Sequence, residues 1–201
     1  MSVTAAWIGQ QRGVAPEHMR VEIAPGVTVP RFAYIDVADE PGIPLTINLS
    51  VVLDGDTYRV DLMKIRRTAP GDDVNLVALR SVRVHEFVQR GLSDIAHDAN
   101  GNPFSPLAPL DEDVLSGYRA EPGGAATLQA VAMTYRMATL LSMRPAKAVR
   151  ERFRLTEATA TVWIRRARDR GILEPAGRKV EPLPLHTFEF VQRDVFEDQD
   201  V

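Results

Sequence analysis

Apolar and polar residues alternate most regularly over residues 45–53, where Leu, Ile, Leu, Val and Leu take every second position. Strict alternation places one set of side chains on each face of a β-strand. Asp54 and Gly55 follow as a tight-turn pair, and a second alternation runs from Tyr58 to Leu62. The sequence therefore predicts a β-hairpin in this region.

Other short apolar stretches surround the hairpin. Val21 and Ile23 alternate before a Pro-Gly pair, and residues 27–37 are rich in Val, Phe, Tyr and Ile, with a bend or sheet edge predicted at Pro30. After the hairpin, the pattern indicates a short strand over Val74 to Leu79 and a helix from about Arg80 to His97. The N-terminal half is therefore expected to be β-rich with one helix.

Residues 98–126 break this pattern, because they concentrate Pro, Gly, Asn and Asp. Such composition is typical of a linker, and we expect a domain boundary here, with a short helix near residues 111–118. Beyond it, Leu128, Val131 and Tyr135 recur at helical spacing and predict a helix over residues 127–142.

Two further helices are predicted after residue 142. Pro145 suits a first helical turn, since its missing N–H has no partner there, and Ala146, Val149 and Phe153 form one apolar face. Thr156 supplies an N-cap oxygen for a second helix, which should run from about residue 157 to residue 170 and end at Gly171. This short pair, with a turn of a few residues, is the pattern of a helix-turn-helix.

The second helix has two different faces at 100° per residue. Its inward face carries Ala160, Trp163, Ile164 and Ala167. Its outward face carries Ala158, Thr161, Val162 and Arg165. Small side chains permit a close approach to a DNA major groove, methyl groups contact thymine, and Arg binds guanine O6 and N7. The outward face therefore has the chemistry of a DNA-reading surface.

These residues resemble a family, the short helix-turn-helix modules of actinobacterial and actinophage DNA-binding proteins. The resemblance covers about residues 127–175 and rests on Arg144, Pro145, Ala148, Val149, Phe153, Trp163, Ile164, Arg166, Ala167, Arg168, Gly171, Ile172, Leu173 and Pro175. Three positions depart from the family pattern. Arg150 replaces an Ala of close helix packing, Arg154 replaces the Gly of the turn, and Glu157 replaces a basic or small residue. The resemblance implies binding to double-stranded DNA.

Charge is unevenly distributed along the chain. Residues 127–170 contain ten Lys or Arg and three acidic residues, although the whole chain has a formal net charge of −3. Attraction to phosphates requires such concentration of basic residues, which favours DNA binding. The alternative interpretation is an amphipathic helical pair with a solvated Arg-rich face.

Composition excludes several classes of site. The chain of 201 residues has no cysteine, which excludes disulfides, thiolate metal sites and cysteine nucleophiles. Nucleophile-elbow, phosphate-loop and dinucleotide motifs are absent from the sequence, and the Asp94/His97 pair and the Asp98–Asn102 stretch are too incomplete for a metal site. We expect no catalytic residues, no cofactor and no metal. With no leader-like or membrane-length apolar segment, the protein is expected to be soluble and cytoplasmic.

The predicted fold is α+β, with a β-rich dimerisation, sensor or partner domain (1–97), a linker (98–126), a three-helix helix-turn-helix domain (127–175), and a strand near 186–191 with an acidic tail (176–201). The predicted function is sequence-specific binding of double-stranded DNA as a transcriptional regulator, acting as a homodimer. The alternative is a non-enzymatic interaction protein of a phage or mobile element. The residues expected at the DNA are Lys147, Arg154, Thr156, Glu157, Ala158, Thr161, Val162, Arg165, Arg166 and Arg168.

Overall fold

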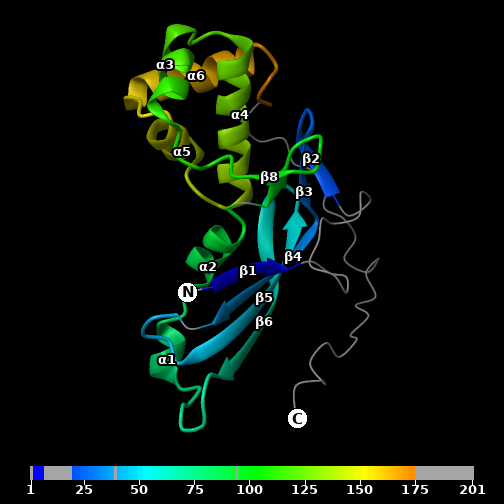
Figure 1. The fold of residues 1–201 in the computed structure, drawn as a ribbon, viewed down its shortest axis with the longest axis vertical. Coiled ribbons are helices and arrows are strands. Elements are labelled where there is room, and N and C mark those ends of the chain that lie inside the picture. Colours follow the sequence, from blue (N-terminus) through cyan, green and yellow to red (C-terminus); the bar gives the residue numbers. More distant parts are fainter. Residues whose placement is uncertain (1, 7–19, 39, 94, 175–201) are drawn as a thin grey trace.

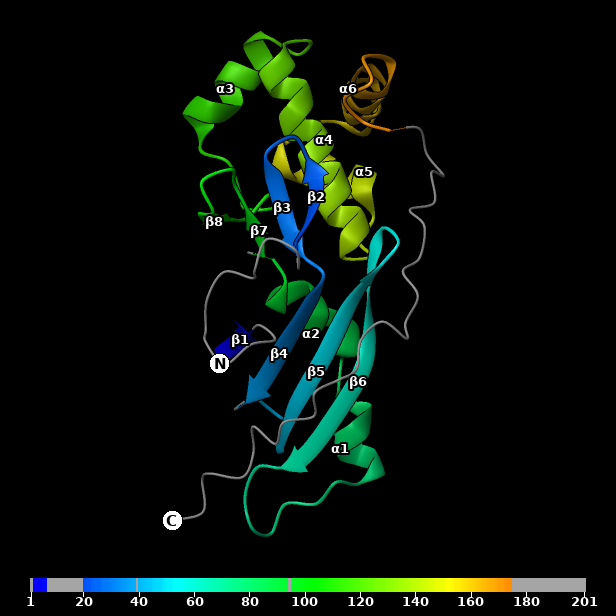
Figure 2. The ribbon, with the colours of Figure 1, turned by 90° about the vertical axis from the view of Figure 1, so that its right-hand side faces the viewer.

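The computed structural model describes residues 2–6, 20–38, 40–93 and 95–174. The fold is mixed α+β, as expected, with two small antiparallel sheets; helices α3 to α6 gather at one end of the molecule, and α1 lies at the other end (Figures 1 and 2). Several predictions fall on residues outside these ranges. They concern Asp94, Pro175, the strand near 186–191 and the acidic tail.

The larger sheet has the strand order β1-β4-β5-β6, formed by β1 (Ser2–Ala6), β4 (Phe32–Ala38), β5 (Leu45–Asp54) and β6 (Thr57–Arg67). The predicted hairpin is confirmed, since β5 pairs with β6 from the Leu45–Arg67 end to Asp54 opposite Thr57. Gly55 has a φ of 64° in the two-residue turn, a conformation that favours glycine. All five alternating apolar residues of β5 are buried.

The smaller sheet has the strand order β2-β3-β7-β8, formed by β2 (Arg20–Ala24), β3 (Val27–Pro30), β7 (Ala96–His97) and β8 (Pro103–Phe104). Residues 27–37 are split between the two sheets, because Pro30 ends β3 and β4 starts two residues later. The predicted bend at Pro30 is thus confirmed. Tyr58 of β6 donates a hydrogen bond from its hydroxyl group to the carbonyl oxygen of Pro30, which ties the two sheets together.

Two helices follow β6 and precede β7 along the chain. They are α1 (Leu76–Arg80) and α2 (Val84–Gly91). The strand expected over residues 74–79 is wrong, because the Asn75 side chain accepts hydrogen bonds from the N–H groups of Val77 and Ala78 and starts a helix instead. The single helix expected over residues 80–97 is likewise interrupted at residues 81–83 and ends at Gly91, after which the chain enters β7.

The remaining helices are α3 (Glu112–Ala120), α4 (Ala125–Leu140), α5 (Pro145–Arg152) and α6 (Glu157–Asp169). The short helix expected near residues 111–118 is present as α3. Its Leu115 is fully buried among α4, α5 and α6, so this part of the predicted linker belongs to the helical core. The expected three-helix arrangement therefore contains a fourth helix.

Helix α4 contributes to both hydrophobic cores. Leu128 and Val131, near its start, are buried with α3, α5 and α6. Met137 and Leu140, near its end, are buried with the strands and α2. Figure 1 shows α4 running from the helical end of the molecule to the sheets. Helix α4 is therefore a structural connection between the two halves.

Candidate nucleic-acid interface

The turn between α5 and α6 fixes the position of the second helix. Arg154 has a φ of 49°, and its N–H donates to the carbonyl of Glu151 while the N–H of Leu155 donates to that of Arg150. This pair of hydrogen bonds is the Schellman motif, which normally places glycine in the left-handed position. The turn is thus tight even though Arg154 occupies the position of that glycine.

The apolar face of α5 differs by one residue from the prediction. Val149 and Phe153 are fully buried, as expected, but Ala146 is exposed and Ala148 is buried in its place. At 100° per residue, residues 146, 149 and 153 span only about 60°, whereas residues 148, 149 and 153 span about 140°. The buried face of α5 is therefore broader than predicted and extends toward Ala148.

Helix α6 buries the predicted face. Ala160, Ile164 and Ala167 are at most 4% exposed, and Trp163 is 4% exposed with its ring edge-to-face against Phe153, the two centroids 5.8 Å apart. The Thr156 side chain accepts a hydrogen bond from the N–H of Thr159 at 3.2 Å, which confirms the expected N-cap. The opposite face of α6 is therefore the one presented to solvent.

The outward residues Ala158, Thr161, Val162 and Arg165 are all exposed, as predicted. The Thr161 hydroxyl donates to the carbonyl of Glu157 at 2.9 Å, so its own hydrogen is already used and its methyl group and lone pairs remain available. Arg165 and Arg166 make no hydrogen bond or ion pair with another described residue. Asp169, which sequence reasoning did not consider, lies on the same arc in the last turn of α6. Its negative charge restricts a DNA-facing surface to the earlier turns of the helix.

Other predicted phosphate contacts already have protein partners. Lys147 lies 3.6 Å from the Glu151 carboxylate, in an exposed ion pair. Arg168 places its guanidinium 5.2 Å from the centre of the Tyr135 ring and donates a 2.9 Å hydrogen bond to its hydroxyl oxygen. Arg168 therefore helps to join α6 to α4, whatever it contacts in addition.

Two basic residues of the 127–170 region point into the protein. Arg136 donates to the carbonyl of Ile172 at 2.6 Å, and Arg152 donates to the carbonyl of Ala108 at 3.0 Å. Burial lowers the pKa of both guanidinium groups, which still carry a charge at neutral pH. The excess of basic residues counted from the sequence therefore overstates the positive charge at the surface.

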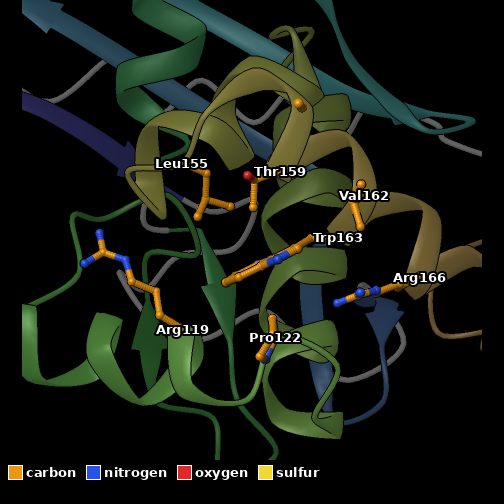
Figure 3. Close-up of a pocket in the computed structure, with 8 residues that line it drawn as sticks. Arg119, Pro122, Leu155, Thr159, Val162, Trp163 and Arg166 are labelled. Atoms are coloured by element: carbon orange, nitrogen blue, oxygen red, sulfur yellow. The ribbon is translucent and has the colours of Figure 1, made fainter.

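A groove runs alongside α6, between this helix and α3 (Figure 3). Its volume is about 470 Å³, and Trp163 and Val162 contribute to its apolar wall. Arg119 of α3 and Arg166 of α6 lie at its two sides. Sequence reasoning missed Arg119, because this residue lies outside the basic region and only the fold brings it beside α6.

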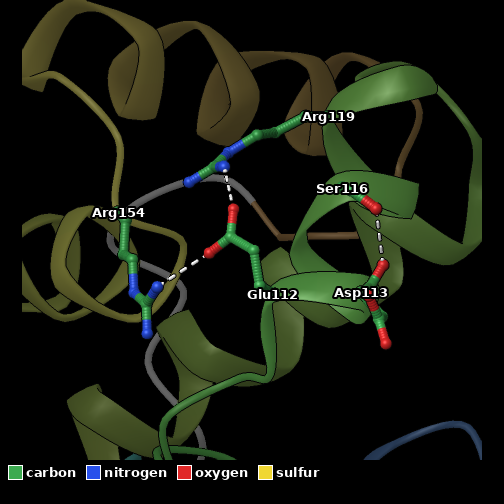
Figure 4. A network of polar contacts seen from close by, with 5 residues as sticks. All are labelled: Glu112, Asp113, Ser116, Arg119 and Arg154. Atoms are coloured by element: carbon green, nitrogen blue, oxygen red, sulfur yellow. Dashed lines mark hydrogen bonds and ion pairs between the residues drawn. The ribbon is translucent and has the colours of Figure 1, made fainter.

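Glu112 connects α3 to the turn of the helix pair (Figure 4). Its two carboxylate oxygens lie 2.8 Å from Arg119 of the same helix and 2.8 Å from Arg154. All three side chains are substantially exposed, so each ion pair contributes little to stability. The network nevertheless orients Arg154 toward α3.

The Asp98–Asn102 stretch, which is too incomplete for a metal site, satisfies its own polar groups. The Asp98 carboxylate accepts hydrogen bonds from the backbone N–H of Asn102 and Asn100 and from the Asn102 side chain. These bonds, those from Asn102 above all, keep the pKa of Asp98 below its usual value. Within the described ranges there is no group of three or more His, Cys, Asp or Glu that could hold a metal ion.

Comparisons of the chain with known protein families, with curated proteins and with solved structures found no match. Among the helices of the described part, none combines the length and the apolar character needed to cross a membrane.

Proposed function

We propose that this protein binds double-stranded DNA sequence-specifically through α6 and acts as a transcriptional regulator in the cytoplasm. The observation that carries the proposal is that α6 has a buried apolar face and an exposed face on its opposite side. This helix buries Trp163 against Phe153 and exposes Ala158, Thr161 and Arg165 on the opposite side. In the first turns of α6, Glu157, Ala158 and Thr161 are exposed.

In this proposal α6 enters the major groove with its N-terminal turns. Arg165 donates to guanine O6 and N7, and the methyl groups of Thr161 and Val162 contact thymine. Arg166 is the best phosphate contact, since it is exposed and unpaired within the described chain, whereas Lys147, Arg154 and Arg168 must divide their charge between phosphates and protein partners.

The test compares single alanine variants in a duplex-binding titration at several salt concentrations, after selection of the preferred site from random duplexes. Arg165→Ala should weaken binding to that site by about 1–3 kcal/mol and relax its sequence preference. Arg166→Ala should weaken binding to all duplexes alike and lower the salt slope by about 1. Arg59→Ala, which removes an exposed arginine of β6, is the matched control and should change neither quantity.

Unchanged binding in both α6 variants would show that the outward face of α6 does not contact DNA. Arg168→Ala is unsuitable as a phosphate probe, because it would also remove the contact with Tyr135.

The second candidate function is that of a non-enzymatic interaction protein of a phage or mobile element. The observation that favours it is the apolar groove beside α6, where Trp163 and Val162 could receive a partner side chain. Salt-dependent retention on heparin and on random duplex discriminates the two functions. Retention that is lost in Arg165→Ala/Arg166→Ala supports DNA binding, and retention that is absent in the native chain supports the interaction protein.

A single helix-turn-helix contacts only a few base pairs, so useful specificity requires two copies on a duplicated site. We therefore propose that the protein binds DNA as a homodimer and that its N-terminal half binds a further ligand or protein partner.

A further inference from the structure

Helix α1 exposes its large apolar residues and buries a small one. Its one buried residue is Ala78, at 7% exposed, whereas Leu76 is 64% and Val77 is 76% exposed. Val74 and Leu79 beside them are 43% and 38% exposed. A surface helix normally buries its large apolar residues and exposes its small ones, because burial of large apolar side chains stabilises the fold.

The exposed apolar residues are close together in the sequence, and Leu76, Val77 and Leu79 cover most of the circumference of α1 except the side of Ala78. With ordinary side-chain areas, Val74, Leu76, Val77 and Leu79 together expose roughly 350 Å². They lie within six consecutive positions on one short helix and its preceding turn. An area of this size matches the apolar centre of a protein interface that buries about 800 Å² on each partner. The flanking polar residues must supply the rim.

The charges at the two ends of this segment have opposite sign. Asp72 and Asp73 precede the apolar residues, and Arg80 and Arg83 follow them. Asp73 and Arg80 are exposed, and Arg83 makes an exposed ion pair with Glu86 of the next helix. In an antiparallel pair of α1 segments around a twofold axis, the acidic end of each segment lies opposite the basic end of the other. The segment is therefore complementary to a second copy of itself.

We propose that residues 72–83 form the dimer interface of this protein, with α1 packed antiparallel against α1 of a second copy. The proposal extends the homodimer of the proposed function, but it is argued from α1 alone and does not depend on DNA binding. Helices α1 and α6 lie at opposite ends of the molecule (Figures 1 and 2), so this interface leaves α6 uncovered.

The test measures the mass of the full chain by sedimentation velocity over a range of concentrations. The native chain should be dimeric at about 50 μM, and Val77→Glu should raise the dimer dissociation constant at least about tenfold, because it places a carboxylate in the apolar centre. Val114→Glu on α3 changes a valine that is 44% exposed and is the matched control, with no effect on mass expected. Circular dichroism checks that each variant folds.

Charge exchange tests the antiparallel arrangement. Asp73→Lys and Arg80→Glu should each weaken the dimer, because each places like charges opposite one another. An equimolar mixture of the two variants should form heterodimers in preference to either homodimer, since each new charge then faces its opposite. The double variant should dimerise like the native chain.

A monomeric native chain, or a dimer that Val77→Glu leaves intact, would overturn the proposal. A dimer whose charge variants do not prefer each other in the mixture would overturn the antiparallel arrangement. Retention on a DNA duplex is measured separately on the same variants. A monomeric Val77→Glu chain that still binds duplex weakly would support the interface and leave the DNA-binding proposal standing by itself.

Discussion

Replacement of Arg154 by glycine should stabilise the protein slightly, although it removes an ion pair. Arg154 holds a φ of 49°, and the left-handed conformation costs a residue with a Cβ about 1–2 kcal/mol. Glycine removes this cost. Two effects oppose this gain. The substitution removes the ion pair with Glu112, which contributes about 0.5 kcal/mol because the two side chains are 57% and 61% exposed. Glycine also increases the entropy of the unfolded chain, which costs about 0.5 kcal/mol. The expected net gain in the free energy of unfolding is about 0.5 kcal/mol.

The chain contains an internal reference for this comparison. Ser142 ends α4 with a φ of 53°, and its N–H donates to the carbonyl of Thr139 in the same Schellman motif. Its side chain makes no ion pair, so Ser142→Gly should gain more stability than Arg154→Gly, by about 0.5 kcal/mol. Glu112→Gln, which keeps the strained backbone of Arg154 and removes the ion pairs, should instead lose about 0.5–1 kcal/mol.

Urea denaturation of the three variants provides the assay. For a chain of this size, a change of 0.5 kcal/mol shifts the melting temperature by only about 1–2 °C, so the denaturation midpoint is the better measure. If Arg154→Gly loses more than about 1 kcal/mol, the Arg154 side chain stabilises the turn by more than the strain costs, and the reasoning from φ is refuted.

Three other variants test separate parts of the fold. Burial, and to a smaller extent the positive charge of Arg20, lower the pKa of His97 in the folded protein. The neutral imidazole therefore contributes stability above about pH 6.5, and this contribution is lost as the pH falls toward the lowered pKa of the folded state. The melting temperature of the native protein should fall more than that of His97→Gln between pH 7.5 and about 5.5. Gly91→Ala would place a Cβ 2.8 Å from the Ile35 Cγ2 atom, and the net loss in unfolding free energy should be about 1–2 kcal/mol despite better helix propensity; no loss by urea denaturation would show that Ile35 readily moves. Thr156→Ala removes the N-cap of α6 and should cost about 1 kcal/mol, with Thr156→Ser as the control that preserves it.

The hairpin and both faces of α6 could be predicted because their signals are local. Alternation over nine residues and a Gly turn specify the pairing of β5 with β6. The bounds of α6 are indicated by the N-cap at Thr156 and by Gly171 after its end, and Trp163 indicates its buried side. In both cases the local sequence favours a single structure, so no choice between a strand and a helix is left to tertiary contacts.

Helix α1 could not be predicted because its sequence fits two structures. Residues 74–79 are mostly apolar, and a short apolar run of this length is compatible with a strand or a helix. The Asn75 side chain decides in favour of the helix, because it satisfies two N–H groups that a strand would pair with a neighbouring strand. The apolar residues that suggested a buried strand are the ones left at the surface.

Surface charge was overestimated because a count of residues does not show which side chains point inward. Arg136, Arg152 and Arg168 each donate a hydrogen bond to the protein, to Ile172, Ala108 and Tyr135 respectively. Nothing in the spacing of these arginines distinguishes them from the exposed Arg165 and Arg166. Arg165 and Arg166 are exposed on α6 without a hydrogen-bond or ion-pair partner among the described residues, which makes them the decisive residues of the DNA-binding proposal.

The linker predicted over residues 98–126 gives no indication that α4, which follows it, belongs to both cores. Helical periodicity shows that residues 127–140 share an apolar stripe, but it does not show that the stripe contacts one core at Leu128 and another at Met137. Membership of two cores is a property of the fold and not of the helical period, so the sequence pattern alone assigns α4 to a single domain.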